Sequence, residues 1–251
     1  MAWAITAWYA QKMDIDPAKI VSVSVMPCTA KKFEVGRDDQ SASGYADVDI
    51  SITTRELARM IKSAGISFNS LPDETFDSPL GEGSGAGVIF GATGGVMEAA
   101  LRTAVEKITG QTLENVDFTE VRGMEGVKEA TYAVGDLQIK VAVASGTKNA
   151  KTLMEQVKNG TSEYQFIEIM ACPGGCINGG GQPIQRDATR NTYPVRELRA
   201  KALYAEDASL KYHRSDESPV IETIYKEYFG EPNSEKAHHI LHTSYHEREK
   251  Y

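Results

Sequence analysis

The chain of 251 residues is 41% hydrophobic and 25% charged, which is ordinary for a folded protein long enough to bury a sizeable core. Its net charge of −8 and the lack of a long lysine or arginine run argue against nucleic acid as a partner. Its apolar stretches are far shorter than the roughly 20 residues that cross a bilayer, and its first residues lack the basic segment of a signal peptide. We therefore expect a cytoplasmic protein without membrane association.

Two cysteine segments follow predicted strands. Residues 20–27 alternate valine with serine until Pro27 removes a hydrogen-bond donor just before Cys28. A second strand over 164–171 runs directly into Cys172. Because ligands of open α/β sheets collect at the carboxyl ends of strands, both cysteines lie where a bound group is expected.

Strands and helices alternate along most of the chain. Further strands are predicted over 48–52 and in a hairpin that turns at Gly135 and Asp136. Helices are predicted over 2–13, over 55–64 after a capping box at Thr53 or Thr54, over 93–110 after a glycine-rich loop, over 149–158, and in three segments after Pro183. This order predicts an α/β lobe over residues 1–184, with a parallel or mixed four-stranded sheet flanked by helices, followed by a helical extension over 185–251.

The cysteines indicate metal or redox chemistry. Cys28, Cys172 and Cys176 cannot all pair, and a reducing compartment would keep them as thiols. The last two lie in the glycine-rich "MACPGGCINGGGQP" of residues 170–183. Thiolates are soft ligands suited to iron–sulfur clusters, zinc or copper(I), and glycine lets the backbone approach such a group closely.

Other interpretations of the polar residues stay open at this point. Cys28 alone could be a small buried apolar residue, and three thiols with one histidine could form a Cys3His zinc site. His238, His242 and His246 share a helix face and could bind zinc or nickel, although an interfacial or solvated position fits them better. The glycine-rich segment 81–95 lacks the lysine and the complete motif of a nucleotide-binding loop.

Several segments resemble the C-terminal part of the catalytic domain of iron-only (FeFe) hydrogenases. "MPCTAKKFE" at 26–34 and "MACPGGCINGGGQP" at 170–183 are similar to the second and third cysteine signatures of that family, and "FGATGGVMEAALRT" at 90–103 is similar to a further family segment. The tail over 199–246 resembles the small-subunit segment that ends these enzymes or is encoded separately. The resemblance covers nearly the whole chain and implies an oxidoreductase of anaerobic hydrogen metabolism.

The resemblance also implies roles for individual residues. Cys28, Cys172 and Cys176 would be thiolate ligands of the 4Fe-4S part of the H-cluster, and Cys176 would bridge it to a di-iron subcluster with CO and CN ligands. Lys31 would hold a cyanide ligand by a charge-assisted hydrogen bond, with Glu34 beside it. Further residues would line or bind the cofactor: Met26, Pro27, Phe90, Gly91, Met170, Pro173, Gly174 and Gly175.

Part of the family's site has no counterpart in these residues. The first cysteine signature, of the "TSCxPxW" kind, would lie upstream, together with the fourth cluster ligand and the proton-donating cysteine. We therefore expect the chain to be inactive alone and to need the upstream half of a hydrogenase, in cis or in trans.

Ferredoxin or a similar carrier would exchange electrons with the complete enzyme during reversible hydrogen oxidation. The bare surface would favour self-association or binding of the missing half. The alternative is a non-catalytic hydrogenase-like module that keeps an iron–sulfur cluster or zinc for sensing or assembly.

Overall fold

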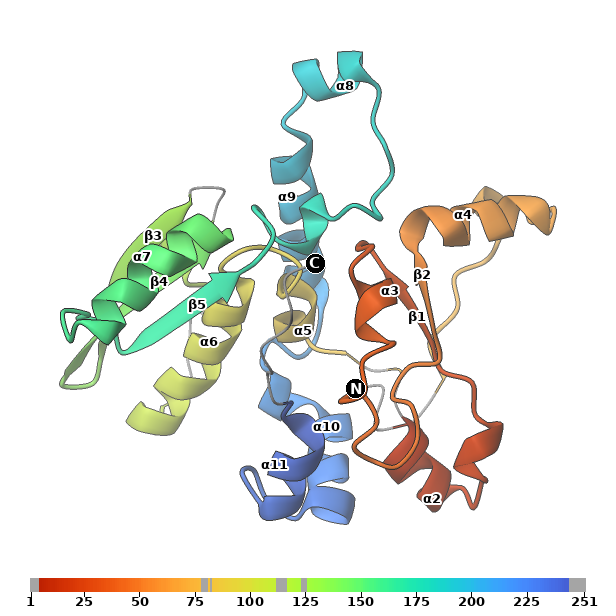
Figure 1. Ribbon diagram of the computed structural model, residues 1–251, viewed down its shortest axis with the longest axis horizontal. Coiled ribbons are helices and arrows are strands. Elements are labelled where there is room, and N and C mark those ends of the chain that lie inside the picture. Colours follow the sequence, from red (N-terminus) through yellow and green to blue (C-terminus); the bar gives the residue numbers. More distant parts are fainter. Residues whose placement is uncertain (1–4, 78–80, 82, 112–116, 123–125, 244–251) are drawn as a thin grey trace. The chain divides into compact units, whose positions relative to one another are not determined.

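The structure is a computed structural model that describes residues 5–77, 81, 83–111, 117–122 and 126–243 (Figure 1). The chain forms two compact units, one made of Met1–Asp73 with Val220–Tyr251 and the other of Glu74–Pro219. The first unit is therefore built from both ends of the chain. The boundary predicted at residues 184 and 185 does not coincide with this division and stays a prediction.

The first unit contains a two-stranded parallel sheet and short helices. Its elements in chain order are the π-helical turn η1 (Ile5–Tyr9), α2 (Ala10–Lys12), η2 (Pro17–Lys19), β1 (Val23–Met26), α3 (Lys31–Glu34), β2 (Ile50–Thr53), α4 (Thr54–Ser63), η3 (Phe68–Ser70), α10 (Pro219–Ile224), η7 (Tyr225–Phe229) and α11 (Glu235–Leu241). β1 pairs with β2 so that Val23 lies opposite Ile50. Both predicted strands are confirmed, and β1 ends directly before Pro27, which cannot donate to a ladder.

Helix α4 begins with the predicted capping box. The backbone N–H of Glu56 donates to Thr53 Oγ1 at 3.2 Å, and the backbone N–H of Thr53 donates to Glu56 Oε2 at 2.7 Å. Lys32 Nζ pairs with the same carboxylate at 2.9 Å. The hydrogen bond from the Thr53 backbone, followed by those from Lys32 and the Thr53 hydroxyl, lowers the pKa of Glu56 to about 2.

The first helical segments of the described chain, η1 and α2, contact η7 within the first unit. Trp8 Nε1 donates to Glu227 Oε2 at 2.9 Å, and Lys12 Nζ pairs with the same oxygen at 2.9 Å. Lys12 Nζ also lies 4.8 Å from the centroid of the Trp8 ring. The helix predicted over 2–13 is confirmed as η1 and α2, and residues 2–4 lie outside the described part.

The second unit holds the larger sheet and the longer helices. Its elements in chain order are α5 (Gly85–Ile89), α6 (Gly95–Thr109), η4 (Thr119–Val121), β3 (Val127–Val134), β4 (Leu137–Ser145), α7 (Thr147–Lys158), β5 (Phe166–Met170), η5 (Cys176–Asn178), α8 (Asp187–Thr192), α9 (Val195–Ser209) and η6 (Ser215–Glu217). None of the helices in the described ranges of the chain is both long and apolar enough to cross a bilayer.

The sheet of the second unit has the strand order β3-β4-β5. β3 and β4 form the predicted antiparallel hairpin, while β4 and β5 are parallel, with Ser145 opposite Met170. Alternate residues of β4 enter different parts of the core. Val141 and Val143 pack with Met97 and Leu101 of α6, whereas Ala142 and Ala144 pack with Leu153 of α7.

The α/β class and the helices of the C-terminal segment are confirmed, and one detail of the sheet differs. In the described part of the chain, five strands form a two-stranded parallel sheet and a three-stranded mixed sheet, instead of the single four-stranded sheet that was expected. A local residue pattern indicates which segments are extended, whereas strand partners depend on contacts between distant segments. The sequence therefore predicted the strands better than their pairing.

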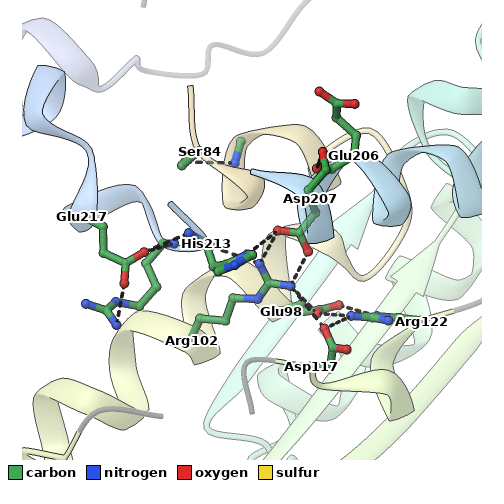
Figure 2. A network of polar contacts seen from close by, with 12 residues as sticks. Ser84, Glu98, Arg102, Asp117, Arg122, Glu206, Asp207, His213 and Glu217 are labelled. Carbon is green, nitrogen blue, oxygen red and sulfur yellow. Dashed lines mark hydrogen bonds and ion pairs between the residues drawn. The ribbon is translucent and has the colours of Figure 1, made fainter. Parts of the chain in front are cut away.

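A buried arginine joins α6 to α9 (Figure 2). Arg102 is fully buried, and its Nη1 and Nη2 donate to the two carboxylate oxygens of Asp207 at 2.9 and 2.7 Å. Nη2 also donates to Glu98 Oε1 at 2.8 Å, from one turn earlier in α6. Burial alone would lower the pKa of Arg102, but the two carboxylates raise it, so the guanidinium stays charged.

A second arginine shares the Glu98 carboxylate. Arg122 Nε and Nη2 donate to the two oxygens of Glu98 at 2.8 and 2.5 Å, and Nη2 also donates to Asp117 Oδ1 at 2.7 Å. The Arg122 guanidinium lies 4.0 Å from the centroid of the Tyr204 ring on α9. The buried carboxylate of Glu98 is therefore neutralised from two sides.

We expect Arg102→Leu to lower the free energy of unfolding by about 3–5 kcal/mol, because it leaves Asp207 and Glu98 buried with fewer counter-charges. Urea unfolding of the purified chain measures this loss. The control is Arg190→Ala, which removes an exposed ion pair with Asp187 and should change the stability by less than about 0.5 kcal/mol. Equal effects of the two variants would contradict a stabilising role of the buried cluster.

Candidate metal centre

Two cysteines lie on the loop that follows β5. Cys172 and Cys176 are both exposed, and none of the three cysteines of the chain forms a disulfide. The backbone N–H of Gly175 donates to Cys172 O at 2.9 Å, and η5 begins at Cys176. The parallel pairing of β4 with β5 sets the start of this loop, because Gly146 N donates to Met170 O at 2.8 Å.

The loop rests on the backbone of the turn before α6. Gly174 and Gly175 have positive φ angles of 85° and 89°, and a Cβ at Gly175 would lie 2.7 Å from Gly91 O and 2.8 Å from Thr93 N. Thr93 N donates to Gly174 O at 3.3 Å, and Ile177 N donates to Gly91 O at 3.0 Å. Glycine is therefore required at position 175 by both its dihedral angle and its surroundings.

Glu168 of β5 holds the same turn from the strand. Its carboxylate is buried and accepts hydrogen bonds from the backbone N–H groups of Gly94 and Met97, at 2.8 and 2.7 Å. Burial raises the pKa of Glu168, although the two backbone donors act in the opposite direction. The sequence analysis did not single out Glu168, and the available signal was a carboxylate inside the apolar strand "FIEIM".

The second unit gathers several of the residues that the sequence analysis assigned to the cofactor. Gly91, Gly174 and Gly175 are in backbone contact, as described above. Met170 is half-buried at the end of β5, and Pro173 is exposed on the loop. Phe90 follows α5 with an exposed side chain, directly before Gly91. Their roles toward a cofactor stay predictions.

The first unit carries the other predicted site residues. Cys28 is half-buried and lies between β1 and α3, two residues after Met26 and directly after Pro27, which are also half-buried. Lys31 Nζ forms an ion pair with the carboxylate of Glu34 on the single turn of α3. The two side chains therefore contact each other, and their roles toward a cofactor stay predictions.

Among the residues that the structure describes, histidines and thiols do not form a recognisable metal site. Among the described residues, no group of three or more His, Cys, Asp or Glu side chains is arranged to hold a metal ion. The rings of His238 and His242 stack with centroids 4.4 Å apart at the end of α11, and His246 lies outside the described part. The zinc tetrahedron, which would need thiols of both units, and the three-histidine site, which includes His246, stay predictions.

The donor set of the Cys172–Cys176 loop fits a soft metal or an iron–sulfur cluster. The loop has two exposed thiols, and its glycines allow the backbone to approach a bound group closely. Free cysteine with a purely structural role is usually buried, so the exposure of both thiols argues against such a role. Two exposed thiols on a glycine-rich loop at the end of a strand are typical of a class of protein, one that binds a metal cluster through thiolates.

Comparison with known proteins identifies the family. The model of the iron only hydrogenase large subunit, C-terminal domain, matches residues 1–180, and that of the iron hydrogenase small subunit matches residues 193–248. The chain therefore belongs to the iron-only hydrogenase family. The resemblance of the cysteine segments and of the tail is confirmed by these two matches.

Individual relatives include enzymes and a protein of another kind. The NADP-reducing hydrogenase subunit HndD of Solidesulfovibrio fructosivorans is 49% identical over 97% of this chain, which covers 41% of that relative. The cytosolic iron-sulfur assembly component 3 of Rattus norvegicus is 31% identical over 100% of this chain, which covers 52% of it. The chain thus spans about half of these curated relatives, or less.

A solved structure confirms the fold. A variant of the FeFe-hydrogenase HydA1 from Chlamydomonas reinhardtii superimposes with a TM-score of 0.77 at 40% sequence identity. The match covers 97% of this chain and 67% of that structure.

We expect Gly175→Ala to lower the free energy of unfolding by about 2 kcal/mol or more, since a Cβ there needs a strained φ and meets the Gly91–Thr93 backbone. Gly160→Ala is the matched control, with a φ of +68° and no atom within 4 Å of the added carbon, and should cost about 1 kcal/mol. Urea unfolding compares the two. Equal losses would show that the close approach contributes nothing beyond the dihedral angle.

Proposed function

We propose that the chain is the C-terminal, cluster-binding part of an iron-only hydrogenase that catalyses reversible oxidation of hydrogen. The observation that carries the proposal is the Cys172–Cys176 loop. Its two thiols are exposed, and its glycines contact the turn before α6. Membership of the hydrogenase family supports the same assignment.

Three thiolates would hold the cofactor. Cys28, Cys172 and Cys176 are proposed ligands of the 4Fe-4S part of the H-cluster, with Cys176 shared with the di-iron part. When bound, the H-cluster supplies the site at which dihydrogen is split or formed. A cubane has four irons and this set has three thiols, so a further ligand would come from another region of the enzyme.

Other residues of the chain would orient and shield this group. Lys31 offers a compact cation for an anionic ligand, and its ion pair with Glu34 restrains the long side chain. The apolar side chains of Met26, Phe90 and Met170 would exclude water from the cofactor. Low local polarity strengthens each charge-assisted hydrogen bond that remains.

The complete enzyme would need partners. We propose that a further hydrogenase region, in the same polypeptide or in another chain, contributes the missing ligand and the proton donor. This proposal is supported by the greater length of the relatives, of which the chain covers 41% and 52% in the two examples above. Ferredoxin or a similar carrier would exchange electrons, and the cytoplasm is the proposed location. Self-association stays a further prediction.

A second candidate function is a non-catalytic module for cluster sensing or assembly. The observation in its favour is the relative from Rattus norvegicus, whose name is that of an iron-sulfur assembly component and which aligns with the whole chain. In that case the chain would keep the cluster without turning over hydrogen, whether or not a further region is present.

We expect anaerobic reconstitution with iron and sulfide to give a reduced cluster that is visible by EPR when a hydrogenase upstream region is supplied. Hydrogen-evolution activity should appear only after a di-iron cofactor is added. Serine variants of Cys28, Cys172 and Cys176 should each reduce the bound iron, whereas the surface variant Glu155→Gln should match the wild type.

The outcomes separate the two candidates. Uptake of zinc in place of iron would contradict the hydrogenase and would leave only a non-catalytic module that keeps zinc. A stable cluster without activity in the reassembled protein would favour the assembly module over the hydrogenase. Wild-type activity of Cys176→Ser would contradict its shared-ligand role.

We expect Lys31→Met to lower the activity of the reassembled, cofactor-loaded enzyme by about 10- to 100-fold, which corresponds to the loss of one charge-assisted hydrogen bond. The neighbouring variant Lys32→Met is the control, because Lys32 pairs with Glu56 and donates to Ser51 O. Its activity for each bound cofactor should stay within about twofold of the wild type. A similar loss in both variants would contradict a specific role of Lys31.

A further inference from the structure

We propose that Glu168 is a positioning residue that fixes the Cys172–Cys176 loop through the turn before α6. Its oxygens hold the start of α6, and the turn between α5 and α6 in turn carries the cysteine loop. The part of this inference that concerns the bound cluster rests on the proposed function.

The first step is the pair of hydrogen bonds between Glu168 and the start of α6. The side chain is only 6% exposed, and each carboxylate oxygen accepts one backbone N–H, from Gly94 at 2.8 Å and from Met97 at 2.7 Å. These donors lie at the N-terminus of a 15-residue helix, where the backbone dipoles favour a negative charge. Glu168 thereby joins the middle of β5 to the beginning of α6.

The second step is the backbone hydrogen bonding between the turn before α6 and the Cys172–Cys176 loop. Gly91 O accepts from Ile177 N at 3.0 Å, and Thr93 N donates to Gly174 O at 3.3 Å, so the loop is bonded on both sides of Gly175. No side chain separates the two backbones, because a Cβ at Gly175 would collide with the turn. A displacement of the turn therefore has to displace the loop.

The two steps close a ring of contacts. β5 leads along the chain to Cys172 only four residues after Glu168, while the carboxylate of Glu168 returns to the same loop by way of α6 and the turn. The loop is thus fixed in two ways. The chain connects it covalently to β5, and hydrogen bonds connect it to β5 again through the turn, α6 and Glu168. Such double fixation holds ligand atoms closer to one geometry than a covalent connection does alone.

Helix capping by itself does not explain this carboxylate. Gly94 at the N-cap of α6 has no side chain, whereas a local Ser, Thr or Asp could satisfy an N–H there without burying a distant charge. A remote glutamate has to be desolvated, which raises its pKa. What it adds over a local cap is the link between β5 and the turn.

Hydrogen exchange of the chain without a cofactor tests this link. Glu168→Gln keeps the size of the side chain but replaces one acceptor oxygen by an amide NH2. Because one of the two N–H groups, that of Gly94 or that of Met97, loses its direct acceptor, these two amides report only the substitution itself. The amides of Thr93 and Ile177 are the reporters, and their protection should fall by about tenfold or more, while that of Leu153 in α7 stays unchanged.

Thiol labelling gives a second readout with an internal control. Glu168→Gln should change the alkylation rates of Cys172 and Cys176 by at least about threefold, while Cys28, which is in the other unit, keeps its rate. Glu155→Gln serves as the matched surface control. If exchange changes only at Gly94 and Met97 and all three thiols react as in the wild type, Glu168 is a helix cap and the inference is overturned.

A second variant and a spectroscopic measurement complete the test. If Glu168→Gln does not fold, Glu168→Asp keeps the charge but is too short to hold both N–H groups, and should change the same reporters by a smaller factor. In the reconstituted protein, Glu168→Asp or Glu168→Gln should shift the EPR signal or the midpoint potential of the cluster at equal iron content. A wild-type chain that takes up no cluster would contradict the proposed function, whereas the cofactor-free measurements would still decide the role of Glu168.

Discussion

The guanidinium of Arg102 is shielded from water, and the second unit is arranged so that this charge is neutralised. Asp207 reaches it from α9, Glu98 reaches it from one turn away in α6, and Gly85 leaves the space, since a Cβ there would lie 1.7 Å from Asp207 Oδ1. Arg122 then shares Glu98 and lies against the ring of Tyr204. Charges that would be costly alone thus connect α6 with α9, at a place where Gly85 of α5 leaves room for Asp207.

The stability of α6 is important because the cysteine loop depends on the start of this helix. Apolar residues of α6 pack on the sheet, its middle is tied to α9 through Arg102, and its N-terminus is held by Glu168. The backbone of the turn before α6 lies directly against Gly175. The thiols are therefore positioned mainly by main-chain contacts, which glycine permits and which a larger residue would prevent.

Local patterns predicted what depends on neighbouring residues. The ends of β1 and β5 before the cysteines, the hairpin turn and the capping box at Thr53 were all read from short stretches of sequence. Strand pairing between distant segments was not predictable in this way, and neither was the meeting of Arg102 with Asp207 or of Glu168 with Gly94. Each of these depends on folding that brings remote residues together, and only an isolated charge in an apolar context hinted at them.

The use of both chain ends in the first unit makes Glu74–Pro219 an insertion within it. During synthesis the inserted unit can complete its contacts while the first unit still lacks α10 and α11, and with them the Glu227 carboxylate that binds Trp8 and Lys12. Of Cys28, Cys172 and Cys176, Cys28 is synthesised first, yet its unit gains Glu227 only after the other two thiols have been synthesised.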